Sequence, residues 1–142
     1  MKTLPTALSV LALASVLLAG VAVADSSLVL PTESVWEGRY LCAQGSTALT
    51  LTVRPVGGDV VTAIFAFGPT PENPDVPRGS YTMRGTLSAG SHTVHLVPER
   101  WLAQPSGYVM VGMTGTFDVQ RGVMQGSIDH PGCGPFQLRR VR

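Results

Sequence analysis

The segments MRGTL at 83–87, MTGTF at 113–117 and MQGSI at 124–128 repeat one pattern, in which a glycine stands midway between two apolar residues. Successive side chains of a β-strand point to opposite faces, so the glycine and both apolar residues would share one face. A glycine at such a position lets the strand bend sharply or lets a large side chain pack over it. Repeated mid-strand glycines also allow a small sheet to curl closed. The repeats therefore favour a barrel over a flat sandwich.

The sequence on either side of these repeats alternates between apolar and polar residues, and turn residues recur about every 8–12 positions. This pattern predicts strands and no helix. The expected strands cover 35–42, 49–54, 60–67, 80–87, 92–96, 107–117, 123–128 and 136–141. Two longer loops are predicted between them, at 68–79, which contains four prolines, and at 98–106, which contains Trp101. Short links between consecutive strands favour a meander, so the expected fold class is all-β, a small antiparallel eight-stranded meander barrel.

The two cysteines, Cys42 and Cys133, are expected to form one disulfide. Cys42 ends the first predicted strand and Cys133 precedes the last one, and these two strands are neighbours in a closed barrel. The disulfide and the closure of the barrel therefore support each other. The disulfide would close a loop that spans nearly the whole domain. In the chain-entropy model, such a crosslink stabilises the folded state by about 4–5 kcal/mol. A reactive thiol or a metal ligand is the alternative, but no Cys–His cluster has the spacing of a zinc site.

The first residues have the pattern of a secretory signal peptide. Lys2 precedes an uncharged stretch at 4–24, which ends on the small-x-small sequence Ala22-Val23-Ala24. An uncleaved membrane anchor is the alternative, because the stretch is long enough to span a bilayer. The cleavage pattern and the lack of a basic cluster after it favour cleavage, which leaves no stable membrane insertion. We expect a signal peptide at 1–24, a flexible leader at 25–34 and one barrel domain at 35–142, exported to the periplasm or the extracellular space.

The charge of the exported part is close to zero. The whole chain has ten Lys and Arg residues against nine Asp and Glu residues, and Lys2 lies in the predicted signal peptide. Nucleic-acid binding requires a basic surface that neutralises phosphates. The composition therefore argues against nucleic acid as a partner and against electrostatic docking to anionic membranes.

The sequence carries no recognisable catalytic motif and predicts no cofactor. His92 and His95 are three residues apart, so on a strand they would point to opposite faces and would not hold one metal together. Asp129 and His130 are adjacent, and neighbouring side chains rarely point at one target. A nucleophile elbow and a zinc-protease helix motif are both missing from the sequence. We expect a protein that is not an enzyme, with a hydrolase using His92 or His130 as an alternative.

The segment PERWLAQPSGY at 98–108 is the most distinctive candidate for binding. Trp, Tyr and Arg are the side chains that concentrate binding energy at interfaces, and a Trp in a loop can stack on a sugar. The candidate binding residues are Arg100, Trp101, Gln104, Ser106 and Tyr108. The sequence thus predicts a binding module for a protein or a cell-wall glycan. In the alternative interpretation, Trp101 is a plug that closes one end of the core.

A third interpretation places a small apolar ligand inside the barrel. Such a carrier would hold its ligand near Phe65, Phe67, Tyr81 and Met110. An eight-stranded barrel is just wide enough to be filled by side chains or to hold one small ligand.

Tyr40-x-Cys42, the late Cys133 and the segment Ser106-Gly107-Tyr108 resemble the periplasmic inhibitors of C-type lysozyme. The resemblance implies a small antiparallel barrel that inserts a loop, here around Ser106 and Gly107, into the lysozyme cleft. The chain departs from that family in its proline-rich loop, in the long loop expected around Trp101 and in having no lysine after position 2. The opening Trp36-Glu37-Gly38 is also similar to lipocalin-like barrels, which as a rule are longer and carry a helix that this chain lacks.

Overall fold

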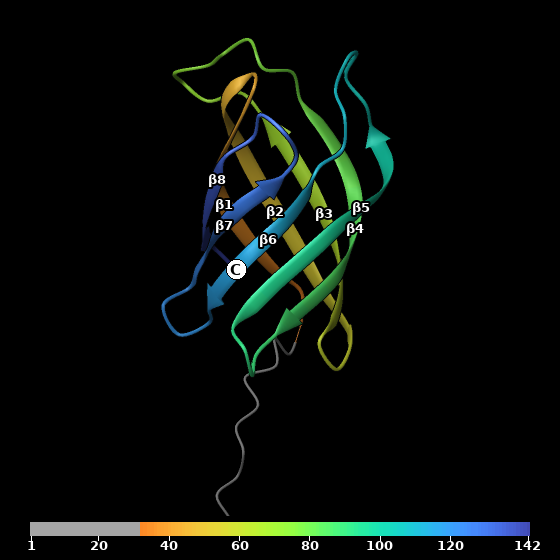
Figure 1. Cartoon of the computed structure of the whole chain (residues 1–142), viewed down its shortest axis with the longest axis vertical. Helices are drawn as coiled ribbons and strands as arrows, with labels where there is room; N and C mark the ends of the chain where they lie inside the picture. Colours follow the sequence, from red (N-terminus) through yellow and green to blue (C-terminus); the bar gives the residue numbers. More distant parts are fainter. Residues whose placement is uncertain (1–31) are drawn as a thin grey trace, which may run out of the picture.

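The computed structural model describes residues 32–142 as a closed barrel of eight antiparallel strands in meander order (Figure 1). The strands are β1 (Ser34–Cys42), β2 (Gly45–Gly57), β3 (Val60–Gly68), β4 (Gly79–Ser88), β5 (Thr93–Ala103), β6 (Gly112–Asp118), β7 (Val123–Asp129) and β8 (Pro135–Arg140). Each strand pairs with the next, and β1 pairs with β8 to close the barrel. The predicted fold class is confirmed.

Some predicted boundaries are not covered or shift slightly. The signal peptide and the leader up to residue 31 lie outside the described residues. Ser34, which the sequence placed in the leader, opens β1 instead, and its Oγ accepts a hydrogen bond from Trp36 Nε1 at 3.0 Å. In the part that is described, no helix is long and apolar enough to cross a membrane.

The backbone of a neighbouring strand lies directly against each of the repeated glycines. Gly115 on β6 stands directly opposite Gly126 on β7. A Cβ atom on Gly126 would collide with the carbonyl oxygen of Thr114 and lie 2.5 Å from the Cα of Gly115. A Cβ on Gly85 would collide in the same way with the carbonyl oxygen of His95 on β5. These positions therefore require glycine because the backbone of the next strand occupies the space of a side chain.

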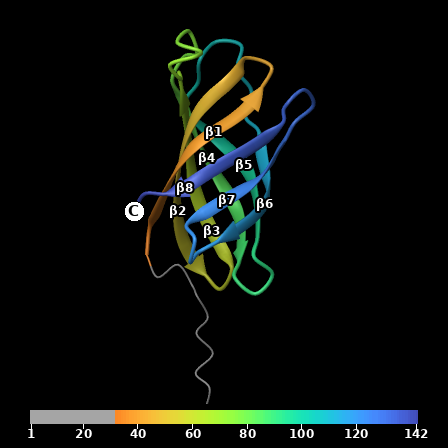
Figure 2. The same cartoon turned by 90° about the vertical axis from the view of Figure 1, so that its left-hand side faces the viewer.

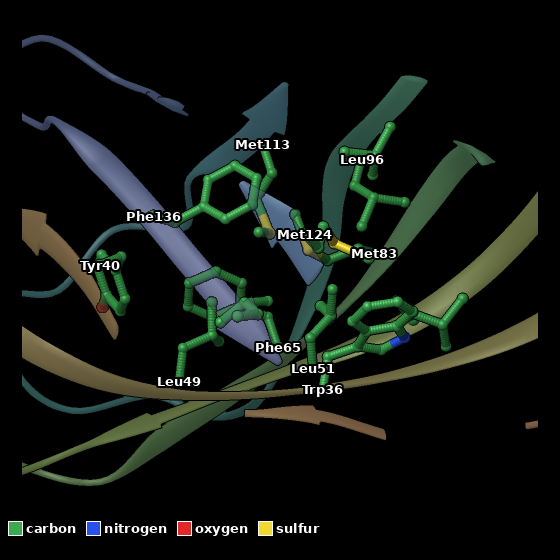
Figure 3. Close-up of a cluster of buried hydrophobic side chains, with 14 of the residues drawn as sticks. Trp36, Tyr40, Leu49, Leu51, Phe65, Met83, Leu96, Met113, Met124 and Phe136 are labelled. Atoms are coloured by element: carbon green, nitrogen blue, oxygen red, sulfur yellow. The ribbon is translucent and has the colours of Figure 1, made fainter. Parts of the chain in front are cut away.

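The interior of the barrel is filled by its own side chains (Figure 3). Trp36, Leu51, Phe65, Met83 and Met124 are fully buried and come from different strands. They alternate with outward polar residues, as a strand with one buried face requires. On β1, Trp36 and Tyr40 are buried and form its inward face.

The structure corrects the sequence prediction around β5. The segment predicted as a loop at 98–106 continues β5 as far as Ala103, and the loop lies at 104–111 instead. The strand predicted at 107–117 therefore begins only at Gly112, and Val109 is exposed in the loop before it. Register shifts opposite Ser80–Tyr81 and Thr82–Met83 let β5 follow β4 past Pro98. His92 was predicted to begin the strand at 92–96, but β5 begins at Thr93. His92 lies in the turn before it, with a left-handed φ of 56°.

The disulfide joins Cys42 at the end of β1 to Cys133 in the β7–β8 loop, as predicted. Next to it the amide of Gly134 donates a hydrogen bond to the carbonyl of Leu41 at 2.8 Å. The loops β1–β2, β3–β4, β5–β6 and β7–β8 all lie at this end of the barrel, which we call the disulfide mouth (Figures 1 and 2). The other end carries the short turns β2–β3, β4–β5 and β6–β7.

Candidate functional site

A pocket of about 310 Å³ opens at the disulfide mouth. Four segments that are distant in the sequence form it: the β1–β2 hairpin, the end of β3 with the start of β4, the β5–β6 loop and the β7–β8 loop. The lining residues are Tyr40, Cys42, Ala43, Gln44, Phe67, Tyr81, Gly107, Tyr108, Val109, Val111, His130, Pro131 and Cys133. Its size and its predominance of aromatic and aliphatic groups are typical of a small ligand site.

Aromatic rings form one wall of this pocket. Tyr108 stacks on Phe67 with the ring centroids 5.4 Å apart and the planes at 16°. Trp101 packs edge-on against Phe67 at 6.3 Å and against Tyr81 at 5.2 Å. Offset stacking and edge-on contacts are the favoured arrangements of aromatic pairs. The loop that carries Tyr108 is therefore held against the core by its own aromatic residue.

The hydroxyl of Tyr81 fastens the end of the β5–β6 loop. It donates a hydrogen bond to the carbonyl of Val111 at 2.9 Å and accepts one from the Val111 amide at 3.1 Å. Val111 directly precedes β6, where the backbone has left its ladder with β5. A buried backbone group without a hydrogen-bond partner is costly. The Tyr81 hydroxyl therefore supplies the hydrogen bonds that a neighbouring strand would otherwise make to Val111.

The proline-rich β3–β4 loop is fixed to the β1–β2 hairpin by Asn73. Its Nδ2 donates to the carbonyl of Gln44 at 2.6 Å and to that of Ser46 at 3.2 Å. The Gln44 side chain in turn donates to the Tyr40 hydroxyl at 3.3 Å and to Thr47 Oγ1 at 3.0 Å. One hydrogen-bonded chain thus connects the loop to the pocket wall.

An exposed ion pair between Arg39 and Glu72, at 2.9 Å, joins the same two segments on the outside. The Glu72 backbone amide and the Arg39 guanidinium both lower the pKa of the Glu72 carboxyl.

The pocket wall is electrically neutral. No Asp, Glu, Lys or Arg is among the residues that line it. Burial raises the pKa of the Tyr40 and Tyr81 hydroxyls above their ordinary value of 10.0, so both remain protonated at neutral pH. His130 is exposed at the edge, with its Nδ1 2.8 Å from the carbonyl oxygen of Pro131. The site thus offers rings, aliphatic surface and a few neutral hydrogen-bonding groups.

The structure separates the five candidate binding residues. Tyr108 lines the pocket, and Trp101 lies behind the wall, half-buried against Phe67 and Tyr81. Gln104 is exposed and donates to the carbonyl of Tyr108 at 3.3 Å, which braces that loop. Ser106 is exposed in the β5–β6 loop, whereas Arg100 is exposed on the outer wall of β5, beside Thr82.

The residues of the hydrolase interpretation do not form one group. Asp129 Oδ2 accepts a hydrogen bond from Thr114 Oγ1 at 2.7 Å, whereas His130 lies against Pro131. His92 is exposed in the β4–β5 turn at the opposite end of the barrel. Among residues 32–142, no cluster of three His, Cys, Asp or Glu side chains is placed to hold a metal ion.

Sequence reasoning did not identify Tyr40, Gln44 and Val111 as parts of a site. Tyr40 and Gln44 lie two residues on either side of Cys42, so their proximity to the predicted disulfide was the available signal. For Val111 the sequence contains no such signal, because its place depends on the Tyr81 hydroxyl. No protein-family model matches the chain, and neither a curated protein nor a solved structure matches it.

Proposed function

We propose that this protein is a non-enzymatic binding module that recognises its partner at the disulfide mouth. The observation that carries the proposal is the neutral, aromatic pocket of about 310 Å³, built by loops that are tied to one another. Loops held on a rigid scaffold are a frequent location of binding sites. A preorganised site also loses little conformational entropy when it binds.

The chemistry of the pocket fits a protein partner that inserts an apolar or aromatic side chain. The exposed Leu102 and Val109 lie at this end of the barrel, on the strand and the loop next to the pocket. Tyrosine and tryptophan in pockets shielded from water are typical of the residues that dominate protein interfaces. A carrier of small apolar ligands has less support, because side chains fill the interior. Of the four residues expected near such a ligand, Phe67 and Tyr81 line the mouth pocket, whereas Phe65 and Met110 do not.

We also propose that the protein is exported. The disulfide between Cys42 and Cys133 supports this proposal, because such bonds persist in oxidising compartments. The signal-peptide pattern at 1–24 supports it independently.

Inhibition of a lysozyme is a second candidate function. Ser106 and Gly107 are exposed in the loop beside the pocket, and Gly107 has a φ of 77°. That placement would let the Ser-Gly segment reach into a cleft, as the resemblance to lysozyme inhibitors implies. A lysozyme activity assay tests this candidate: unchanged lysozyme activity at a large excess of the oxidised protein would exclude it.

A thermal-shift titration of the oxidised protein against lysozymes, wall fragments and apolar ligands tests the main proposal. A partner at about a hundred times its dissociation constant raises the free energy of unfolding by about 2.7 kcal/mol. We expect Tyr108→Ala to abolish the shift and Val56→Ala, at an exposed position in the turn end of the barrel, to retain it. A shift that survives in Tyr108→Ala would place the binding site elsewhere.

A further inference from the structure

A second concave surface lies on the outside of the barrel. It is a groove of about 630 Å³ across the outer faces of β1, β8, β7 and β6, which lie side by side in Figure 2. Outward side chains of all four strands line it, together with Gly115, Gly126 and the buried Tyr40 and Phe136. Tyr40 borders both the groove and the mouth pocket, and their linings share no other residue.

One row of polar side chains crosses this groove at right angles to the strands. Thr116 on β6 stands opposite Gln125 on β7, Gln125 opposite Gln137 on β8, and Gln137 opposite Arg39 on β1. Neighbouring strands are about 4.8 Å apart, so the row extends over roughly 14 Å. Ser127 and Ser46 border it.

The groups in this row keep most of their hydrogen-bonding capacity. Within residues 32–142, the side chains of Thr116, Gln125, Gln137 and Ser127 make no hydrogen bond to another protein group. Arg39 uses one nitrogen for Glu72 and lies close to its counter-charge. No carboxylate lines the groove, so the row offers several donors and acceptors with little net charge.

We propose that this groove binds a neutral, extended glycan strand. A sugar chain presents hydroxyl groups at regular intervals, and the length of one residue in an extended chain is close to the distance between strands. Planar amide and guanidinium groups can each form two hydrogen bonds with neighbouring hydroxyls. The exposed side chains of Leu41 and Pro135 supply apolar surface at the disulfide end, against which a sugar face can pack.

An extended peptide fits the groove less well. Such peptides bind to a sheet mainly by adding a strand at a free edge. In the groove, β1, β6, β7 and β8 are each paired on both sides, so their backbone groups are already occupied. A ligand in the groove can therefore form hydrogen bonds only with side chains, and a ligand rich in hydroxyl groups can do so.

The glycan site does not depend on the proposed function of the mouth. Calorimetric titration with hexamers of β-1,4-linked N-acetylglucosamine and of β-1,4-linked glucose tests it directly. We expect one of them to bind, and the double variant Gln125→Ala/Gln137→Ala to weaken binding roughly tenfold or more. Gln120→Ala, an exposed glutamine in the β6–β7 turn, is the matched control and should leave the affinity unchanged.

Two further arms make the result decisive. Tyr108→Ala should leave glycan binding intact, since that side chain lines the mouth pocket and not the groove. Glycan binding that is lost in Tyr108→Ala but kept in the double glutamine variant would overturn the groove proposal. So would a lack of binding to both hexamers, or binding of a neutral Gly-Ser peptide in their place.

Discussion

The two ends of the barrel are closed in different ways. At the turn end, Gly58 and Gly122 adopt the left-handed φ values of 56° and 62° that tight turns between adjacent strands require. At the disulfide mouth, the longer loops are fixed by contacts between side chains and backbone: the disulfide, Asn73 on the hairpin, and Tyr81 on Val111. The same frame therefore carries one end that local sequence determines and one that depends on contacts between distant residues. The disulfide mouth holds the larger pocket, of about 310 Å³, whereas the pocket between the β4–β5 and β6–β7 turns measures about 160 Å³.

Removing the disulfide should have the largest effect and should act at one end. The double variant Cys42→Ser/Cys133→Ser lacks the crosslink between two residues that are 91 positions apart in the sequence. We expect its free energy of unfolding to be lower by about 4–5 kcal/mol. Urea unfolding measures the loss. Hydrogen exchange should speed up more at the Gly134 amide, bonded to Leu41, than at the Arg140 amide, bonded to Gly122. Equal acceleration at both amides would contradict the difference between the ends.

A side chain at a mid-strand glycine should disturb both ends together. Gly126→Ala places a Cβ against the backbone of β6, and we expect a loss of about 3 kcal/mol because backbone cannot move aside cheaply. Gly90→Ala, in the β4–β5 turn, is the control, since nothing lies within 4 Å of its Cβ. Thermal unfolding of the two variants should separate them clearly. Similar melting temperatures would show that the close approach of β6 and β7 is not required.

Trp101→Ala separates the plug from the recognition interpretation. Trp101 is half-buried and contacts Phe67 and Tyr81, so we expect a loss of roughly 2–3 kcal/mol of stability, below the range for a fully buried tryptophan. Chemical denaturation gives this value. A plug predicts that loss, whereas unchanged stability with a lost partner would make Trp101 a recognition residue.

Tyr81→Phe should loosen the mouth by a smaller amount. Both backbone groups of Val111 lose their partner, at a cost of about 1–3 kcal/mol. Denaturation at neutral pH measures the loss, and unchanged stability would mean that the hydroxyl is dispensable.

The same variant should change the alkaline stability of the protein. Burial raises the pKa of Tyr40 and Tyr81, so above about pH 10 the unfolded chain releases protons that the folded barrel retains. The contribution of each tyrosine is therefore fully present below pH 10 and is lost as pH rises, at about 1.4 kcal/mol per pH unit. We expect Tyr81→Phe to remove one of these two contributions to the slope. An identical slope in both proteins, measured by denaturation at increasing pH, would contradict the assigned burial.

Much of the frame could be predicted from the sequence, because its determinants are local. Alternating burial in β1 to β4 and the repeated glycines produce the barrel, and the positions of Cys42 and Cys133 predict its closure. The limits of β5 could not be predicted, because Pro98 and the polar residues after it are typical of a loop. Pairing with β4 through two register shifts overrides that tendency. Conversely, residues 107–110 include Tyr108 and Val109, which favour a strand, but they lie in the loop between β5 and β6.

Fewer residues of the candidate site than of the frame could be predicted from the sequence. Tyr108 was identified because it lies in a distinctive segment, and it does line the pocket. The residues opposite it come from the β1–β2 hairpin and the β7–β8 loop, which no sequence spacing connects to that segment. Arg100 shows the converse: it is adjacent to Trp101 in the chain but faces the outer wall, because neighbours on a strand point to opposite sides.

The pairing of β1 with β8 also brings the two ends of the domain together, since Val35 exchanges backbone hydrogen bonds with Val141 and Arg142. A circular permutant is therefore feasible, with a short linker from Arg142 to Ser34 and new termini between Gly57 and Gly58, where added side-chain atoms would meet nothing within 4 Å. Every strand pair and the disulfide would be retained, while the order of folding along the chain would change. A permutant with native-like circular dichroism and an intact disulfide mouth would show that the closed ladder, and not its starting point, specifies the barrel.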